Sequence, residues 1–364
     1  MRRSWEMIVR MFCVVAMAAT GLTATATAAT AADPPRWGFA VIRSDGSPDY
    51  SRQGGSWPGG YWVQTTLGGP GQVFVRFPQI GRASGGVAHV TAITLSADWC
   101  QVEGWWQSGA DEIVAVQCHR HGVGPIASWF SLSFGDSSQY LSMPQAFGYV
   151  HWDGSAVVSR FNSSGPAAVN TVEPTSLPGA WWAVLPGFGS EFHAGNIQVT
   201  AVDPSVPARC KVAGWQPTPP AQRIVVRCYD ATGAPLNTGW SLTYHRERPV
   251  AGPSESNRFA YTFHIAFGTS VSPMTMAYLN YNSRGGTVQI SSNPDGPKKQ
   301  VVFTAVGGTS PDNVQVTAVG YNAEFCNLSG PWVWDITRVM IRHVACYDGN
   351  RKVDHSAMVT YAAR

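Results

Sequence analysis

The sequence predicts an all-β protein made of three tandem copies of a β-sandwich-like unit of about 105 residues, each with one disulfide. The first observation is composition: the chain has 38 Gly and 25 Pro, and its 13% charged residues are about half the usual share. The second is a set of short alternating runs, such as HVTAITL, RIVVRC and WSLTY, bounded by turn-forming residues. The third is a pattern that recurs three times.

Residues 1–32 have the features of a secretory signal peptide. Arg2, Arg3 and Arg10 precede the apolar run FCVVAMAATGL, and the small-residue run TATATAATAA follows it. We expect cleavage near Ala32 and an extracellular mature chain. The apolar run is too short to cross about 30 Å of hydrocarbon, so we expect no membrane insertion of the mature chain.

The charge of the mature chain does not favour a polyanionic partner. The leader holds three of the 25 basic residues and one of the 22 acidic residues, so about +1 remains. Nucleic acid is therefore not an expected partner.

The repeated pattern begins with a strand-like phrase. Its three versions are GVAHVTAI (86–93), GNIQVTAV (195–202) and DNVQVTAV (312–319). Each is followed by a cysteine that opens CQVEGWW, CKVAGW or CNLSGPW, and a second cysteine closes VAVQC, VVRC or HVAC. A last strand reads FSLSF, WSLTY or MVTY. We therefore expect β units at 36–134, 147–244 and 259–364, joined by polar linkers at 135–146 and 245–258. The pattern allows either three separate domains or one body with pseudo-threefold symmetry.

The six cysteines of the mature chain are spaced alike in the three copies. Separations of 18, 18 and 20 residues make pairing inside each unit the economical interpretation. The expected disulfides are Cys100–Cys118, Cys210–Cys228 and Cys326–Cys346. On an entropic model, each should stabilise its unit by about 3 kcal/mol.

Residues that recur at equivalent places in all three copies are expected to build the core. The recurring aromatic residues are Trp105, Trp215 and Trp332, followed along the chain by Phe134, Tyr244 and Tyr361.

The candidate catalytic and metal-binding groups do not recur. His119 and His121 have the spacing of two ligands on one strand face, but their counterparts are turn-like CYDAT and CYDGN, so an exposed turn is preferred. Asp111 and Glu112 are likewise expected in a solvated turn. Because no G-x-S-x-G or H-E-x-x-H stretch is present, we predict no enzyme, no metal and no cofactor.

A set of aromatic residues that do not recur is the candidate ligand-binding set. Inter-unit packing would also explain them, but rings beside Asn, Gln and Asp suit stacking on sugars or anchoring of a protein partner. The set comprises Trp57, Tyr61, Trp62, Trp106, Trp181, Trp182 and Trp334.

The order NVQVTA, C-x-V-x-x-W and V-x-C-Y-D, with YNSRGG at 281–286, resembles secreted tandem-repeat β proteins of actinomycetes and related bacteria. The resemblance covers essentially residues 36–364 and implies an extracellular repeat protein, without an activity or site residues. We therefore expect a binding or surface-interaction protein for a glycan, cell wall or protein. The alternatives are a structural envelope component and, less favoured, a hydrolase.

Overall fold

The computed structural model confirms the all-β prediction and its three disulfide-bonded units. It describes residues 34–83, 85–253, 256–266, 279–292, 297–308 and 311–364. The expected signal peptide lies outside these residues.

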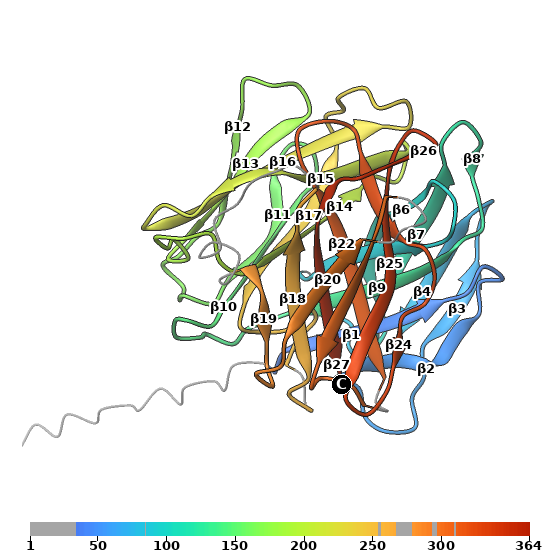
Figure 1. Cartoon of the computed structure of the whole chain (residues 1–364), viewed down its shortest axis with the longest axis horizontal. Helices are drawn as coiled ribbons and strands as arrows, with labels where there is room; N and C mark the ends of the chain where they lie inside the picture. Colours follow the sequence, from blue (N-terminus) through green and yellow to red (C-terminus); the bar gives the residue numbers. More distant parts are fainter. Residues whose placement is uncertain (1–33, 84, 254–255, 267–278, 293–296, 309–310) are drawn as a thin grey trace, which may run out of the picture. The chain divides into compact units, whose positions relative to one another are not determined.

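Each copy contributes two groups of strands (Figure 1). The strands of the first copy are β1 (Arg36–Ile42), β2 (Pro48–Gly55), β3 (Gln64–Leu67), β4 (Gln72–Phe77), β5 (Val87–Ile93), β6 (Asp98–Ser108), β7 (Asp111–Arg120), β8 (Gly124–Pro125) and β9 (Trp129–Asp136). Those of the second are β10 (Ala146–Trp152), β11 (Val157–Asn162), β12 (Thr171–Pro174), β13 (Ala180–Pro186), β14 (Asn196–Val202), β15 (Ala208–Gln216), β16 (Ala221–Asp230) and β17 (Gly239–Arg246). Those of the third are β18 (Phe259–His264), β19 (Tyr281–Asn282), β20 (Val288–Ser292), β21 (Lys298–Thr304), β22 (Asp312–Val319), β23 (Phe325–Leu328), β24 (Val333–Trp334), β25 (Arg338–Asp348), β26 (Arg351–Val353) and β27 (Ser356–Ala363).

The two groups of strands in a copy face each other across one hydrophobic core. In the first copy, Ile42 and Leu132 from one group pack with Val75, Phe77 and Val116 from the other. Alternate residues of strands such as β4 point into this core, as the period of a half-buried strand requires. Each copy is therefore a sandwich of two half-sheets.

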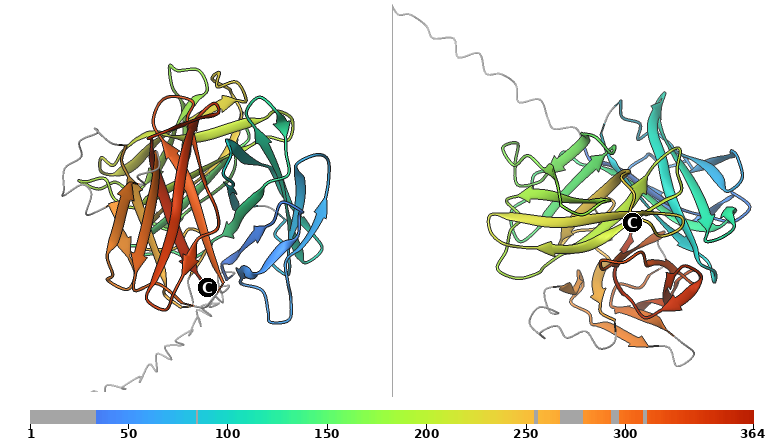
Figure 2. Two further views of the ribbon diagram at one scale, coloured as in Figure 1. Left: turned by 45° about the vertical axis from the view of Figure 1, so that its right-hand side comes forward. Right: turned by 90° about the horizontal axis from the view of Figure 1, so that it is seen from above.

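The half-sheets of different copies are joined, so the copies are not separate domains. Within the described residues, three sheets run in the orders β2-β1-β9-β5-β23-β25-β21-β20, β11-β10-β17-β14-β6-β7-β4-β3 and β12-β13-β16-β15-β22-β27-β18-β19. Each sheet takes half its path from one copy and half from another. Figure 2 shows the three copies, blue to teal, green to yellow and orange to red, gathered around a common centre.

The joints are parallel strand pairs at equivalent positions. A QVTAV-type strand of one copy meets the first-cysteine strand of another in every case, and the paired residues are Val202 with Val102, Val319 with Val212, and Ile93 with Leu328. Copy 2 thus joins copy 1, copy 3 joins copy 2, and copy 1 joins copy 3. This cyclic pairing is a pseudo-threefold arrangement, which the sequence had left open.

The expected disulfides form between directly opposite residues of antiparallel strands. Cys100 faces Cys118, and the other two pairs have the same relation. The recurring aromatic residues also belong to the cores, with Trp332, Phe134, Tyr244 and Tyr361 buried and Trp105 and Trp215 packed against the core edge.

The repeated QVTAV phrase is explained by a ring of side-chain hydrogen bonds at the centre. Thr91 donates to Gln315 Oε1 at 2.8 Å, linking copies 1 and 3. Thr317 donates to Gln198 Oε1 at 2.9 Å, linking copies 3 and 2. Thr200 and His89 Nδ1 lie 3.2 Å apart and link copies 2 and 1. We call these six residues the axial ring.

The same threonine hydroxyls also accept backbone N–H groups from the neighbouring copy. Val316 N donates to Thr91 at 2.9 Å, and Val199 N donates to Thr317 at 3.0 Å. Strands β5, β14 and β22 are buried along almost their whole length, so these polar groups are largely shielded from bulk water. A threonine at this position therefore satisfies two buried groups at once.

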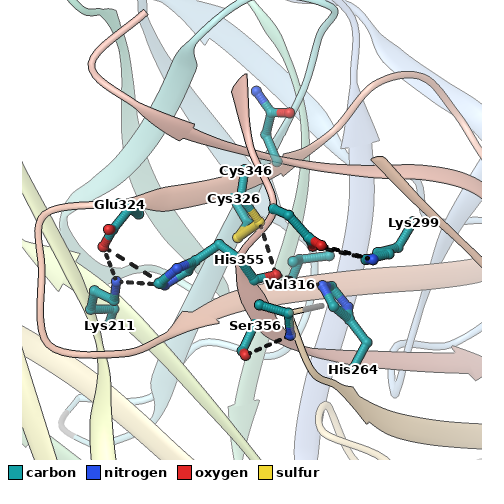
Figure 3. The surroundings of a disulfide bond; sticks show 12 residues. Lys211, His264, Lys299, Val316, Glu324, Cys326, Cys346, His355 and Ser356 are labelled. Carbon is teal, nitrogen blue, oxygen red and sulfur yellow. Dashed lines mark hydrogen bonds and ion pairs between the residues drawn. A yellow bond between two sulfur atoms is a disulfide. The ribbon is translucent and has the colours of Figure 1, made fainter. Parts of the chain in front are cut away.

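A second set of contacts between copies involves the residue after the first cysteine. Gln101 donates to the carbonyl of Asp203 at 2.7 Å. Asn327 donates to the carbonyl of Ser96 at 2.8 Å. In copy 2 the residue is Lys211, which donates to the carbonyl of Asn322 at 3.0 Å and to Glu324 at 3.3 Å (Figure 3). Each copy thus holds a loop of the copy beside it.

Replacing Thr317 with Val should destabilise the protein by about 1–3 kcal/mol, because Gln198 Oε1 and Val199 N–H would lose a buried partner. Thr66→Val, the same change on an exposed strand, should stay within about 0.5 kcal/mol of the wild type. Urea unfolding of both variants measures the difference. Equal midpoints would show that the axial ring does not stabilise the fold.

His89 makes the ring sensitive to acid. Burial lowers its pKa to about 3, with His245 nearby as a smaller cause. The folded chain therefore keeps the neutral imidazole, whereas the unfolded chain takes up a proton below about pH 6.5. The stability that depends on neutral His89 is complete above about pH 6.5 and declines as pH falls toward 3.

His89→Gln places in copy 1 the side chain found in the other two copies, so it should keep the ring and remove one acid-sensitive group. Between pH 6.5 and 4, the free energy of unfolding of the wild type should fall more steeply than that of the variant, by about 1.4 kcal/mol per pH unit. Urea titrations at several pH values measure both slopes, with pH 8 as the reference. Parallel slopes would mean that His89 takes up its proton in the folded chain.

Candidate binding surface

The structure divides the seven candidate aromatic residues into buried and exposed groups. Trp57, only 5% exposed, packs against Phe77 with ring centroids 6.1 Å apart. Trp181, 8% exposed, belongs to the core of copy 2. These two residues therefore cannot contact a ligand from the surface. Trp57 is buried within a Gly/Pro-rich segment because Gly55 leaves space that its ring fills: a Cβ on Gly55 would lie 2.0 Å from the Trp57 ring.

The segment 56–63 presents its middle to solvent because both ends are fixed in copy 1. Trp57 anchors one end in the core. At the other end, Val63 is buried and its backbone N–H donates to Gln53 Oε1 at 2.6 Å. Gly60, with φ of 87°, makes the turn between them. Tyr61 and Trp62 are thus held outward on an anchored loop.

Trp62 meets a residue that sequence reasoning missed. Tyr50 on β2 lies edge-on to Trp62, with ring centroids 6.3 Å apart and an interplanar angle of 87°. Tyr50, Tyr61 and Trp62 are 60%, 47% and 57% exposed. We call these three residues the aromatic patch. The signal available in the sequence was a single aromatic residue, Tyr50, between the polar residues Asp49 and Ser51.

Polar groups border the aromatic patch. Asp49, next to Tyr50, accepts from Ser51 Oγ at 2.7 Å and lies 3.6 Å from Arg43. Arg43 also lines a hollow of about 500 Å³ beside Asp45 and Leu67. The surface therefore combines exposed aromatic rings with charged hydrogen-bonding groups at its edge.

Of the remaining three candidates, Trp106 and Trp182 lie on other sheets, and Trp334 lies at the copy 3 end of the sheet that contains β2. Trp106 on β6 contacts Phe74, with centroids 6.1 Å apart, and Trp182 on β13 stacks with Arg223 at 5.1 Å. Trp334 lies on the short strand β24, opposite Val339. Among the described residues, no ring contact joins any of them to the aromatic patch.

Two polar residues expected in exposed turns are buried instead. His119 is paired with Trp99 across two strands and stacks on its ring at 5.5 Å; burial lowers the pKa of His119 to about 4. Glu112 accepts the backbone N–H of Arg82 at 3.0 Å, and burial raises its pKa to about 7. Both expectations were wrong because the strands β6 and β7 extend further than the turn residues suggested.

Within the described parts of the chain, no three His, Cys, Asp or Glu side chains gather in a way that could hold a metal ion. No helix among the same residues has the length and apolar character needed to cross a membrane. Comparisons with protein-family models, curated proteins and solved structures found no match to this chain.

Proposed function

We propose that the protein is an exported recognition protein that binds an extracellular polysaccharide through the aromatic patch. The observation that carries this proposal is the contact between Tyr50 and Trp62, two exposed rings held by a strand and an anchored loop. Exposed rings of this kind cost free energy in water unless a ligand covers them.

The chemistry of the patch favours sugars. The apolar faces of pyranose rings stack on aromatic side chains, while the Tyr hydroxyls, Arg43 and Asp49 can exchange hydrogen bonds with sugar hydroxyls. Because the loop is fixed at Trp57 and Val63, binding would order few additional side chains.

We also propose that the protein is exported from the cell. The three disulfides indicate an oxidising environment. Residues 1–32 have the order of a cleaved signal peptide, so the first residue of protein recovered from the culture medium should lie near Asp33. N-terminal sequencing measures this, and a chain that retains residues 1–32 contradicts it.

Trp62→Ala should weaken binding to the recognised polysaccharide at least about tenfold, since hot-spot aromatic residues carry most of the energy of an interface. The measurement is a screen of residues 33–364 against a glycan array and cell-wall polysaccharides, followed by calorimetric titration. Trp106→Ala is the matched control, because Trp106 is also exposed but lies on another sheet.

Two other outcomes of these binding measurements would contradict the proposed site or the proposed ligand class. Loss of binding in Trp106→Ala but not in Trp62→Ala would place the site on the sheet that carries β6. If no polysaccharide binds, the polysaccharide proposal is wrong, and capture of a protein partner or self-assembly would identify the alternative class.

A further inference from the structure

Two adjoining hollows form a groove on copy 2, beside the segment that links it to copy 1. Their volumes are about 480 and about 210 Å³, and both are lined by Arg160 and Phe161 of β11. Tyr140 of the linking segment lines the smaller hollow, and Arg82 and Asp136 of copy 1 line the larger one. Sites for small ligands in proteins have volumes of about 300–1,000 Å³. We call this surface the linker groove.

The linker groove occupies the place in copy 2 that the aromatic patch occupies in copy 1. Its wall includes part of the loop 163–170, which joins β11 to β12 as the loop 56–63 joins β2 to β3. The loop of copy 2 has no aromatic residue. The exposed ring of the groove comes instead from the linking segment, at Tyr140.

Tyr140 offers an open aromatic face. Its ring stacks on that of Phe161, with centroids 6.1 Å apart and an interplanar angle of 22°. Phe161 in turn packs against Phe147 and Tyr149, whereas Tyr140 is 56% exposed. One face of the Tyr140 ring is thus covered, and the other faces the solvent. A ring held in this way suits stacking on the apolar face of a pyranose.

Hydrogen bonds between the copies and the linking segment fix the walls of the groove. The Tyr149 hydroxyl accepts the backbone N–H of Gly86 at 3.3 Å and donates to Asp136 at 2.8 Å. Next to Tyr140, the backbone N–H of Leu141 donates to the carbonyl of Ser163 at 2.9 Å. The groove is therefore preformed, so a ligand would order few additional groups.

The excess charge of the groove comes from Arg160. Arg82 lies 2.6 Å from Asp136, so these two charged residues of the wall neutralise each other. Arg160 is exposed, and its Nη1 donates to the carbonyl of Asn170 at 3.3 Å. Among the residues that the structure describes, no carboxylate forms a salt bridge with Arg160. The groove thus combines one positive charge with an open aromatic face.

We infer that the linker groove binds an acidic oligosaccharide whose pyranose rings carry carboxylates. A sugar ring stacks on Tyr140, and its carboxylate pairs with the guanidinium of Arg160, since both residues line the smaller hollow. Guanidinium and carboxylate groups form strong paired hydrogen bonds because both partners are charged. The site is separate from the aromatic patch and does not depend on the proposed function.

Calorimetric titration of residues 33–364, which form one compact unit, tests the inference. The probes are short oligomers of galacturonate, glucuronate and mannuronate, their methyl esters, and an oligoglutamate peptide. At least one uronate should bind, and its neutral ester should bind at least about tenfold more weakly, because the ester cannot form the charge-assisted pair. Trp62→Ala should keep this binding, which separates the linker groove from the aromatic patch.

Neutral or negative results in the same titrations would overturn the inference. These results are no binding of any uronate, equal binding of acid and ester, or binding of the peptide alone. Uronate binding that disappears in Trp62→Ala would assign the acidic sugar to the aromatic patch and would also overturn the inference.

Arg160→Gln should bind the acid and the ester with similar affinity, because the preference for the acid depends on the guanidinium charge. Arg284→Gln is the matched control, since Arg284 is also exposed and also donates to a backbone carbonyl, but it lies in copy 3. A preference for the acid that survives in Arg160→Gln would contradict the assignment of the carboxylate to this arginine.

Tyr140→Ala should weaken binding of the acid and of the ester at least about tenfold, through loss of the stacking surface. Tyr321→Ala is its control, because Tyr321 is likewise 56% exposed but belongs to copy 3. Unchanged affinity in Tyr140→Ala would overturn the inference.

A crystallographic measurement applies without any variant. Crystals of the wild-type chain soaked in the uronate trimers should show a sugar ring over Tyr140, with its carboxylate within hydrogen-bonding distance of the Arg160 guanidinium. Sugar density elsewhere on the surface, with an empty linker groove that is open to the solvent channels of the crystal, would overturn the inference.

Discussion

The axial ring is the interaction on which the rest of the structure depends. Three strands that are each buried almost end to end meet at the centre, so every polar side chain there needs a partner within the protein. The ring supplies it by pairing a Thr of one copy with a Gln or His of another. No copy can satisfy these groups alone, because both partners come from different copies. The QVTAV phrase therefore recurs in the chain because each copy must supply its own Thr and Gln or His to the axial ring.

The cyclic pairing of the copies also determines which strand edges of each sheet are covered. A sandwich made from one copy alone would leave the central edges of β5, β14 and β22, and of the strands that carry the first cysteines, open to solvent or to aggregation. In the closed arrangement these edges pair in parallel across the copies, at Val202 with Val102 and at the two equivalent positions. The edges that remain unpaired belong to the first and last strands of each sheet, which are the strands furthest from the centre in the pairing order.

The three copies differ at those positions of the centre that carry charged or titratable side chains. Arg209 stands where the other copies have aromatic residues, Lys211 where they have amides, and His89 where they have Gln. These three substitutions in an otherwise repeated centre create the buried cation, the Lys211–Glu324 pair and the acid-sensitive member of the ring. The aromatic patch is likewise confined to copy 1, where the loop 56–63 is anchored by Trp57 and Val63; the equivalent loop of copy 2, residues 163–170, has no aromatic residue.

Repetition let the sequence predict the strands, the disulfides and the recurring core aromatics, because three copies must build the same local structure. It could not predict the cyclic pairing, since an alternating strand does not reveal which neighbour its edge will meet. For the candidate surface, the sequence analysis grouped Trp57 with Tyr61 and Trp62, but burial of Trp57 depends on the space left by Gly55, which no sequence pattern reveals. Tyr50 was missed because its partner Trp62 lies on a different element, and no local pattern encodes that contact.

Differential scanning calorimetry of residues 33–364 tests the central claim, that the three copies form one cooperative body closed by the axial ring. A single transition whose van't Hoff enthalpy equals the calorimetric enthalpy is the predicted result. Separate transitions, or a van't Hoff enthalpy of about one third of the calorimetric value, would show three copies that unfold independently and would contradict the account.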